Sequence, residues 1–440
     1  MSRASFLKLA IVTAPFTLLL GRAAQAFGLY VFMVLVPYFL IGLRRTNNIF
    51  HFSRIGWALV AIYMVFPLFD ALALIQGFEP TEEAWKGAHG WSFVLRSQFS
   101  SAIGIVSQLI ALSPFLLSAR SSQLQTVKSD QLMQWWMIGA IVANVVLLVV
   151  VVAQFSTGWN MSAAASYRPD RLMTNGFYRA AGACDHPIPF AGSVLAQFGL
   201  YLYLATSNAN LPPWQKWGSA AIAAISLVCI LLSGSRFALL VAALALVWPV
   251  WKLAKTARLR VIALAALLVA GMAFVKAAGM WDRFAELSLS SFDSLLGGRA
   301  KLWQANWELW QQSKAFGHGG AWLTHQIRKG WYEQLGMPEF SGAYNSHSLI
   351  LEVLTSAGFI GAILVAIFAV IFVRHWRKIY HTKQGIWAQG LMFALGLNLI
   401  HGITQTTYFD TPVAMMLVYP LLLLFWEDQM SARTAVEESA

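Results

Sequence analysis

Two arginines and one histidine carry the clearest chemical signal in this sequence. Arg236 follows a Ser-Gly-Ser turn, Arg299 follows a Gly-Gly pair, and His347 lies in the run Tyr-Asn-Ser-His-Ser at 344–348. A guanidinium stays positively charged at physiological pH, and its fork of donors matches two phosphate oxygens. An imidazole titrates near neutrality, so it can accept a proton from a hydroxyl group. These residue types together favour chemistry on an anionic, phosphate-bearing substrate.

The elements that must position these residues are membrane-spanning helices. Of the 440 residues, 58% are hydrophobic and only 11% are charged, and the mean hydropathy is +0.60. A soluble domain carries about 25% charged residues. We therefore predict an all-α, polytopic membrane protein that forms a single membrane domain over residues 1–440. About twelve apolar segments of roughly 20 residues are visible, at 5–20, 26–43, 55–76, 99–118, 134–155, 186–206, 216–233, 236–254, 260–279, 347–373, 386–404 and 411–426.

The distribution of basic residues predicts how these helices are oriented. Lys and Arg collect on the cytoplasmic side of a bilayer. Placing both termini in the cytoplasm puts most basic loops inside and the acidic loop at 77–98 outside. Arg236, Arg299 and His347 then lie on the outer face, where cations are few and require a reason. The first segment can also be a cleavable signal peptide, because Ala-Ala-Gln-Ala stands at 23–26.

The longest segment without a predicted span is an outer loop at 280–346, between the ninth and tenth helices. Loops of this length inside a compact protein usually carry function. Within it, Trp303, Trp307 and Trp310 recur at helical spacing between Arg299 and Lys314. We expect an interfacial helix there, with its indoles at headgroup level. The Gly-His-Gly-Gly run at 317–320 should end this helix.

Each candidate also has a purely structural interpretation. Outer arginines can extend to lipid headgroups, and this applies most to Arg168, Arg171 and Arg179 in the outer loop at 156–185. Arg236 is the stronger candidate, because a turn at the start of a helix offers backbone donors beside the cation. His347 can instead belong to a helix cap or an aromatic belt, with Asn345 and Ser346 capping the tenth span.

Other polar residues give weaker signals. His318 and His325 have no third ligand at useful spacing, and the two cysteines, Cys184 and Cys229, show no metal-binding pattern. Asp70 and His401 lie within apolar segments, where an ionisable group is a functional hypothesis by default. The sequence shows no Asp-x-Asp motif and no matched pair of carboxylates. We therefore expect no metal and no cofactor, and the lack of a separable basic stretch argues against nucleic acid.

Several short motifs recur here in a fixed order. They are Ser-Gly-Ser-Arg at 233–236, Gly-Gly-Arg-x-x-x-Trp at 297–303, Gly-x-Gly at 317–319, Asn-x-His at 345–347, Ile-Leu-Glu-Val-Leu at 350–354 and Gly-x-x-Gly at 358–361. In their order and their common outer placement they resemble the O-antigen ligase and polymerase superfamily of bacterial inner membranes. The resemblance covers residues 230–361 in motif and most of the chain in topology.

This resemblance implies a metal-independent, inverting glycosyl transfer on the periplasmic side. The donor would be a glycan on undecaprenyl pyrophosphate and, for a ligase, the acceptor a sugar hydroxyl of lipid A-core, both held among membrane lipids. Arg236 and Arg299 match the family's pyrophosphate-binding arginines, and His347 matches the histidine that positions or deprotonates the acceptor. Four further residues are candidate substrate contacts on the same face: Arg179, Ser235, Trp303 and Asn345.

The resemblance leaves two rival functions open. A polymerase of the same superfamily joins repeat units on two lipid-linked glycans, but its arginine-rich Arg-x-x-x-x-Gly pattern is absent after Arg299. Ser348 also replaces the asparagine that often follows the histidine in relatives. Both departures favour the ligase. A transporter or flippase for an anionic lipid should place its ionisable groups near the bilayer midplane, whereas the candidates here cluster at one surface.

Overall fold

The computed structural model describes residues 8–9, 11–13, 15, 128–159, 176–182, 184, 186–207, 211–277, 299–319, 321–337, 346–380, 385–405, 420 and 423. The secondary-structure elements bounded within these ranges are all α-helices, as the sequence predicts. They are α5 (Ser129–Thr157), α6 (Pro187–Thr206), α7 (Pro213–Ser233), α8 (Arg236–Leu253), α9 (Ala257–Ala277), α12 (Arg299–Gln312), α13 (Ala321–Gln334), α14 (Leu349–Tyr380) and α15 (Gly385–Gly402).

Several of the predicted spans can be compared with these helices. Within the described part of the chain, four stretches are by length and composition able to cross a membrane: Asp130–Thr157, Pro187–Thr206, Pro213–Ser233 and Leu349–Arg374. They coincide with four predicted segments, and α8, α9 and α15 occupy three more. Apart from a few single residues, the remaining predicted segments lie outside the described ranges: 5–20, 26–43, 55–76, 99–118 and 411–426. The chain is therefore a helical membrane protein.

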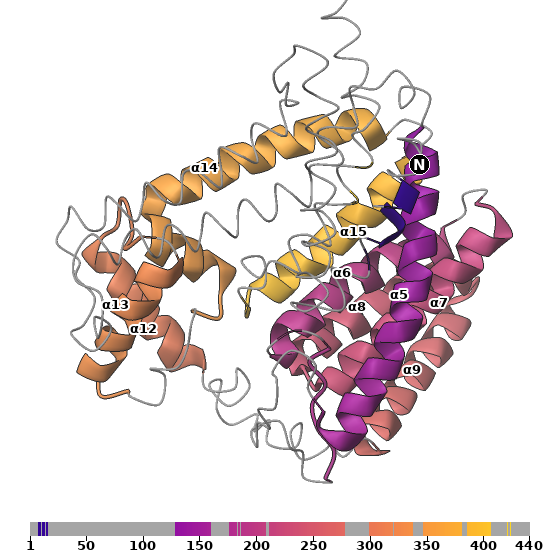
Figure 1. Ribbon diagram of the computed structural model, residues 1–440, viewed down its shortest axis with the longest axis horizontal. Coiled ribbons are helices and arrows are strands. Elements are labelled where there is room, and N and C mark those ends of the chain that lie inside the picture. The colour runs from indigo at the N-terminus through magenta and orange to yellow at the C-terminus, as the bar shows by residue number, and fades with distance from the viewer. Residues whose placement is uncertain are drawn as a thin grey trace, which may run out of the picture.

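The bundle of α5 to α9 and α15 is built around α6 (Figure 1). This helix begins at Pro187, where the Nδ1 atom of His186 accepts the N–H of Ile188 at 3.2 Å. A Cβ atom on Gly199 would lie 2.8 Å from the Cα atom of Ala394, so α6 and α15 approach closely. Small residues permit such van der Waals packing between helices in a membrane.

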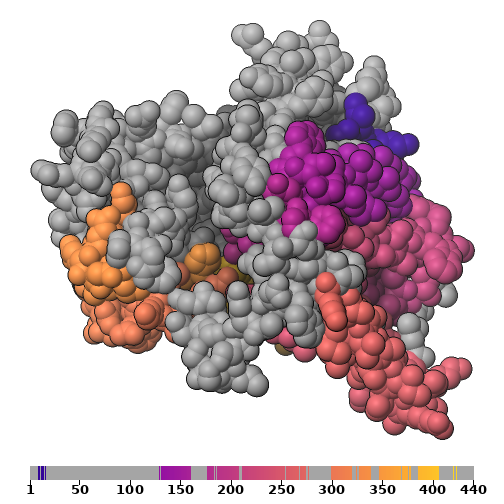
Figure 2. Space-filling model, turned by 90° about the horizontal axis from the view of Figure 1, so that it is seen from below, coloured from indigo at the N-terminus to yellow at the C-terminus, as the bar shows by residue number. Residues whose placement is uncertain are grey.

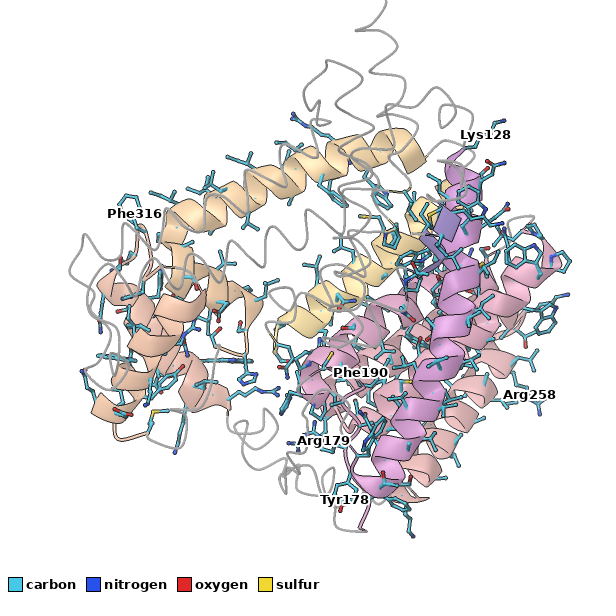
Figure 3. All side chains as sticks on the ribbon, in the orientation of Figure 1. Lys128, Tyr178, Arg179, Phe190, Arg258 and Phe316 are labelled. Carbon is cyan, nitrogen blue, oxygen red and sulfur yellow. The ribbon has the colours of Figure 1, made fainter. Side chains whose placement is uncertain are left out.

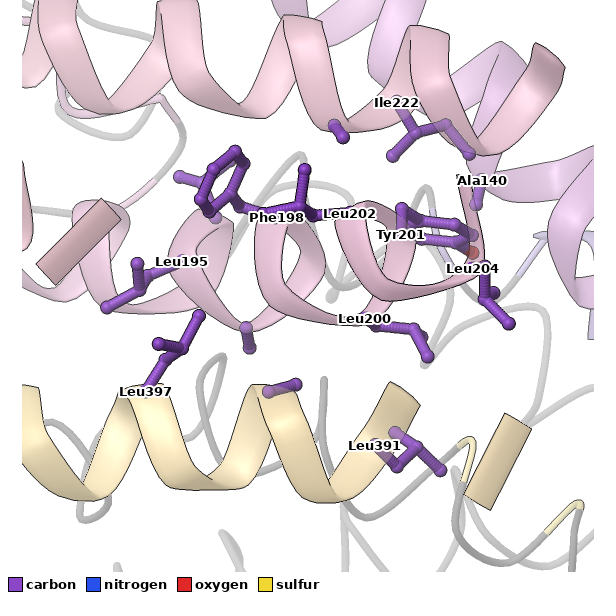
Figure 4. Close-up of a cluster of buried hydrophobic side chains, with 14 of the residues drawn as sticks. Ala140, Leu195, Phe198, Leu200, Tyr201, Leu202, Leu204, Ile222, Leu391 and Leu397 are labelled. Atoms are coloured by element: carbon purple, nitrogen blue, oxygen red, sulfur yellow. The ribbon is translucent and has the colours of Figure 1, made fainter. Parts of the chain in front are cut away.

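Large side chains fill the remaining space around α6. Phe198 and Tyr201 are buried beside Ile222 of α7, and Leu195 faces Leu397 of α15 (Figure 4). A polar contact joins α5 to this core. The side-chain amide of Asn144 donates a hydrogen bond to the side-chain oxygen of Gln197 at 2.8 Å. In contrast, most side chains of α9 are exposed, and Figure 2 shows this helix, in coral, at the edge of the molecule. Its apolar surface is suited to contact with lipid.

Helices α12 and α13 pack together at one end of α14 (Figure 1). The helix predicted between Arg299 and Lys314 is confirmed as α12, which ends at Gln312. Its buried face is Leu302, Ala305, Asn306, Leu309 and Trp310. Trp310 is buried against Phe359, at 5.1 Å between ring centroids, and the placement of the indoles at headgroup level stays a prediction. Trp307 is 46% exposed.

The tenth predicted span, 347–373, is not one continuous helix. Gly358 has φ 61° and ψ −161°, so α14 breaks there. The segment after α12 occupies the break: the N–H groups of Phe359 and Ile360 donate to the carbonyls of Lys314 and Ala315 at 2.9 and 3.1 Å. Backbone groups freed by the break are thereby satisfied inside the protein, as a membrane environment requires.

Glycine is required on both sides of this crossing. A Cβ atom on Gly358 would lie 2.3 Å from the carbonyl oxygen of Ala315, and one on Gly317 would lie 2.5 Å from the amide nitrogen of Ala357. Both glycines also have positive φ angles, 61° and 68°, which other residues adopt at a cost. The two glycine motifs of the sequence, 317–319 and 358–361, therefore meet in space.

Candidate functional site

The Ser-Gly-Ser-Arg motif forms the turn between α7 and α8. Gly234 has φ 61°, and its N–H donates to the carbonyl of Leu231 at 3.0 Å, which ends α7. Arg236 is the first residue of α8, and the side chain of Ser235 makes no capping hydrogen bond to this helix. The amides at a helix start carry partial positive charge and attract anions. Arg236 thus adds a full positive charge at a position that already favours an anion.

Arg179 lies against the same turn. Its Nε–H donates to the carbonyl of Ser233 at 3.0 Å, and the N–H of Ala180 donates to the carbonyl of Leu232 at 2.9 Å. A Cβ atom on Gly234 would lie 3.3 Å from Arg179 Nε, so the turn leaves little space for a larger residue. Figure 3 shows Tyr178 and Arg179 at the end of α5 opposite Lys128.

Arg299 and Arg236 are electrostatic neighbours, although 63 positions separate them in the sequence. The pKa of Arg299 is lowered to about 10, first by burial and second by the positive charge of Arg236. Arg299 begins α12, whereas Arg236 begins α8. Two like charges that share a partly buried site repel each other, so their proximity favours an anionic ligand between them.

The backbone of His347 is held in a strained conformation. Its φ angle of 50° is the one positive value among the non-glycine residues that the structure describes. A residue with a Cβ atom pays a steric cost there, and such strain concentrates at functional sites. Three hydrogen bonds support the segment: Trp303 Nε1–H donates to the His347 carbonyl at 3.3 Å, and the N–H and Oγ–H of Ser346 donate to Glu352 Oε2 at 2.9 and 3.0 Å.

The imidazole of His347 contacts a residue from another helix. Its Nδ1 atom lies 3.1 Å from the Oε1 atom of Gln405. Gln405 follows α15, which ends at Gly402. Burial lowers the pKa of His347, the bond to Gln405 raises it, and the nearby charge of Arg299 lowers it again. The net direction is downward, so the ring is neutral at pH 7 and can accept a proton.

A buried ionic network is joined to the His347 segment through Ser346 and Glu352. Arg328 of α13 is fully buried and forms a salt bridge with Glu352 of α14 at 3.0 Å. Its Nε–H donates to Asn306 Oδ1 of α12 at 2.7 Å, and its third nitrogen donates to the hydroxyl of Thr355. The Asn306 amide in turn donates to the Tyr332 hydroxyl at 2.7 Å. These contacts join three helices behind the segment that carries His347.

Two further histidines lie near these groups. His318 is buried, and its backbone N–H donates to the carbonyl of Thr355 at 2.7 Å. Burial lowers the pKa of His318 to about 4. His401 is buried on α15, one turn before Gln405. Its ring stacks on that of Phe237, at 6.1 Å between the ring centroids, and the positive charge of Arg299 acts on it. Within the described ranges, no group of three or more His, Cys, Asp or Glu residues could hold a metal ion.

The structure thus brings together most of the residues that the sequence singles out. Arg299 lies within electrostatic range of both Arg236 and His347, and Trp303 bonds to the backbone of His347. Arg179 and Ser235 meet at the turn before α8. The other candidates lie outside the described residues or have side chains that are not described: Asp70, Arg168, Arg171, His325 and Asn345.

The sequence patterns do not assign a role to three residues of the site. The sequence motifs include Glu352 without assigning it a role, and they contain neither Arg328 nor Gln405. Glu352 did carry a usable signal, because a single carboxylate in the first turn of an apolar helix needs a partner. Arg328 lies in an ordinary polar helix, and Gln405 follows an apolar helix without any motif, so only the fold could assign them.

Comparison with known proteins agrees with this geometry. Residues 221–366 match the family model described as O-antigen ligase. The comparison with curated proteins gave no match to the chain. The matched region runs from the middle of α7 into α14 and includes Arg236, Arg299, Arg328, His347 and Glu352. Residues 221–366 of this membrane protein therefore form a domain of the O-antigen ligase family, which confirms the resemblance to the O-antigen ligase and polymerase superfamily.

Proposed function

We propose that this protein is an O-antigen ligase of the bacterial inner membrane. It transfers a glycan from undecaprenyl pyrophosphate to a sugar hydroxyl of lipid A-core. The reaction takes place on the periplasmic side, where residues 280–346 form the large loop, and both termini lie in the cytoplasm. Membership of the family supports a glycosyltransferase that acts on lipid-linked glycans. The choice of ligase over polymerase rests on the two departures from the polymerase pattern at Arg299 and Ser348.

One observation carries the proposal: Arg299 interacts electrostatically with Arg236 and with His347, and the three residues come from separate segments. In our mechanism the two guanidinium groups bind the pyrophosphate of the donor. The acceptor oxygen attacks the anomeric carbon, the bond from that carbon to the pyrophosphate oxygen breaks, and His347 takes the hydroxyl proton. The electron pair leaves with the pyrophosphate, whose growing negative charge the arginines stabilise. Attack opposite the leaving group inverts the anomeric carbon.

Other residues of the site have supporting roles in this mechanism. Arg179 holds the turn that begins α8 and contributes a third positive charge. Ser235, Trp303 and Asn345 are proposed to contact the pyrophosphate or the glycan. We expect the reaction to proceed without added metal, because the guanidinium groups meet the charge of the leaving group directly.

The proposal is tested with purified protein in detergent or nanodiscs. The protein is incubated with a glycan on undecaprenyl pyrophosphate and with lipid A-core, in the presence of a chelator, and the conjugate is detected by mass spectrometry. We expect conjugate from the unmodified protein and none from the Arg236→Ala, Arg299→Ala or His347→Ala variants. Near-normal activity of these three variants would refute the site. A product formed only between two lipid-linked glycans would identify a polymerase instead.

A further inference from the structure

The contact between His347 and Gln405 has consequences for the chemistry of the imidazole. Gln405 lies beyond α15 and outside the matched family region, and it is 2% exposed. Its Oε1 atom is 3.1 Å from His347 Nδ1. An amide oxygen can only accept a hydrogen bond, so Nδ1 must carry the proton. In the neutral ring the lone pair is then on Nε2, which makes Nε2 the basic nitrogen.

From this arrangement we infer that Gln405 is a positioning residue that fixes the tautomer of His347 and directs its Nε2 atom toward the acceptor hydroxyl. The inference rests on the proposed function, because it assigns Gln405 a role through the proposed base. The acceptor proton moves to Nε2 while the acceptor oxygen bonds to the anomeric carbon and the pyrophosphate leaves. Gln405 Oε1 keeps its bond to Nδ1–H throughout, so it also stabilises the imidazolium that forms. The imidazolium afterwards returns its proton to water.

An amide suits this position better than a carboxylate for an electrostatic reason. The charged groups that act on His347 are Arg299 of α12, Arg328 of α13 and Glu352 of α14, while α15 presents the uncharged Gln405. A carboxylate at 405 would strongly favour the imidazolium and raise the pKa of His347. The ring would then be protonated over more of the neutral range and unable to act as a base. An amide orients the ring without adding negative charge.

The backbone conformation of His347 does not by itself fix the orientation of the imidazole ring. A φ angle of 50° depends on the bonds of Ser346 to Glu352 and of Trp303 to the His347 carbonyl. These bonds fix where the Cβ atom points, but they leave the rotation of the ring about its own bonds unspecified. Gln405 contacts the ring itself, at Nδ1. Its bond supplies the orientation that the backbone contacts do not.

The test compares Gln405→Leu with Gln405→Glu in the purified conjugation assay over a range of pH. Removing a residue that orients a reactive histidine typically costs about 10- to 100-fold. We therefore expect Gln405→Leu to lower kcat by about 10- to 100-fold with little change in the KM of the donor. Gln405→Glu keeps the acceptor oxygen, so it should recover activity at high pH and move the acid limb of kcat to higher pH.

A matched control is available on α15, the helix that precedes Gln405. Asn398 of α15 is also a buried amide, but it donates to the carbonyl of Ala394 at 3.1 Å within its own helix. Asn398→Leu should leave the pH profile unchanged. Nitrogen NMR of protein labelled at histidine gives a second measurement that does not depend on turnover. The His347 signal, assigned by its loss in His347→Ala, should show a protonated Nδ1 that becomes mixed with the other tautomer in Gln405→Leu.

The outcomes separate this inference from the proposed function. Full activity of His347→Ala would overturn the proposed site itself. Loss of activity in His347→Ala together with an unchanged rate, pH profile and tautomer in Gln405→Leu would overturn the role of Gln405 alone. An equal loss in Gln405→Leu and Gln405→Glu at every pH, without any change of tautomer, would also overturn it, because a purely structural role does not depend on the acceptor oxygen.

Discussion

Arg328 and Glu352 form a salt bridge of 3.0 Å in which the side chains are 0% and 4% exposed. Burying two charges is costly, and only good geometry with further hydrogen bonds compensates for it. Both conditions hold here, because Arg328 also bonds to Asn306 and Thr355, and Glu352 also accepts from Ser346. The pair therefore joins the packing of α12, α13 and α14 to the conformation of His347.

Breaking this ion pair should destabilise the protein and abolish activity. Arg328→Met leaves the Glu352 carboxylate buried without its cation, which costs about 3–5 kcal/mol. The double variant Arg328→Met/Glu352→Leu should regain part of that stability, because no buried charge remains. It should still be inactive, since the backbone N–H of Ser346 loses its acceptor. Unfolding in detergent and the conjugation assay measure the two effects separately. A double variant with full activity would contradict the link to His347.

Replacing the arginines by lysine should impair transfer strongly even though the charge is kept. An ammonium group lacks the two-pronged geometry that fits a pyrophosphate. We expect Arg236→Lys and Arg299→Lys each to lower kcat by about 10²- to 10³-fold, the range for losing one donor to a developing negative charge. Arg258 is an exposed arginine of α9, and Arg258→Lys serves as the control. Equal activity in all three variants would refute the pyrophosphate role.

The activity should fall at acid pH because His347 must be neutral to accept a proton. Burial lowers the pKa of His347 below its usual value of 6.5. The neutral ring therefore predominates at pH 7, and the acid limb of kcat/KM should have its midpoint below the ordinary histidine value of about 6.5. A pH profile of the conjugation assay measures the midpoint of the acid limb. A midpoint above 6.5 would contradict the environment described for His347.

His318 should make the fold sensitive to acid. Burial lowers its pKa to about 4, whereas a histidine in the unfolded chain has the usual pKa of 6.5. Between these values the unfolded chain binds a proton that the folded protein does not, so stability is full above 6.5 and falls as pH decreases. At pH 5 the loss is about 2 kcal/mol. His318→Gln should show a smaller decrease in its unfolding midpoint between pH 7 and 5 than the unmodified protein, and an identical decrease would refute the assignment.

The break in α14 should tolerate no side chain at Gly358. Gly358→Ala combines a positive φ angle with a contact of 2.3 Å to the carbonyl of Ala315, and we expect a loss of about 3 kcal/mol or more. Gly336 is a matched control, because its φ angle is 68° but a Cβ atom there would meet nothing within 4 Å. Gly336→Ala should cost only about 1–2 kcal/mol. Similar losses in both variants would show that the crossing with Ala315 is less close than described.

Much of the helical layout follows from the sequence because it depends on local properties. Apolar runs long enough to cross a bilayer predict α5, α6, α7, α8, α9 and α15, and the spacing of tryptophans predicts α12. The break in α14 could not be predicted with the same ease. Gly358 is compatible with a continuous helix, and what interrupts α14 is the hydrogen bonding of Phe359 and Ile360 to Lys314 and Ala315.

The sequence by itself determined the types of the reacting groups: Arg236 and Arg299 for an anion, and His347 for a proton. The tertiary structure decided which groups surround them. Gln405 lies 58 positions from the histidine that it contacts, and Arg328 lies 24 positions from Glu352. Such contacts depend on how helices pack, and no local pattern of residues encodes that packing. For the same reason only the fold could show that His347 has a lowered pKa, because its charged neighbours come from three helices, α12, α13 and α14.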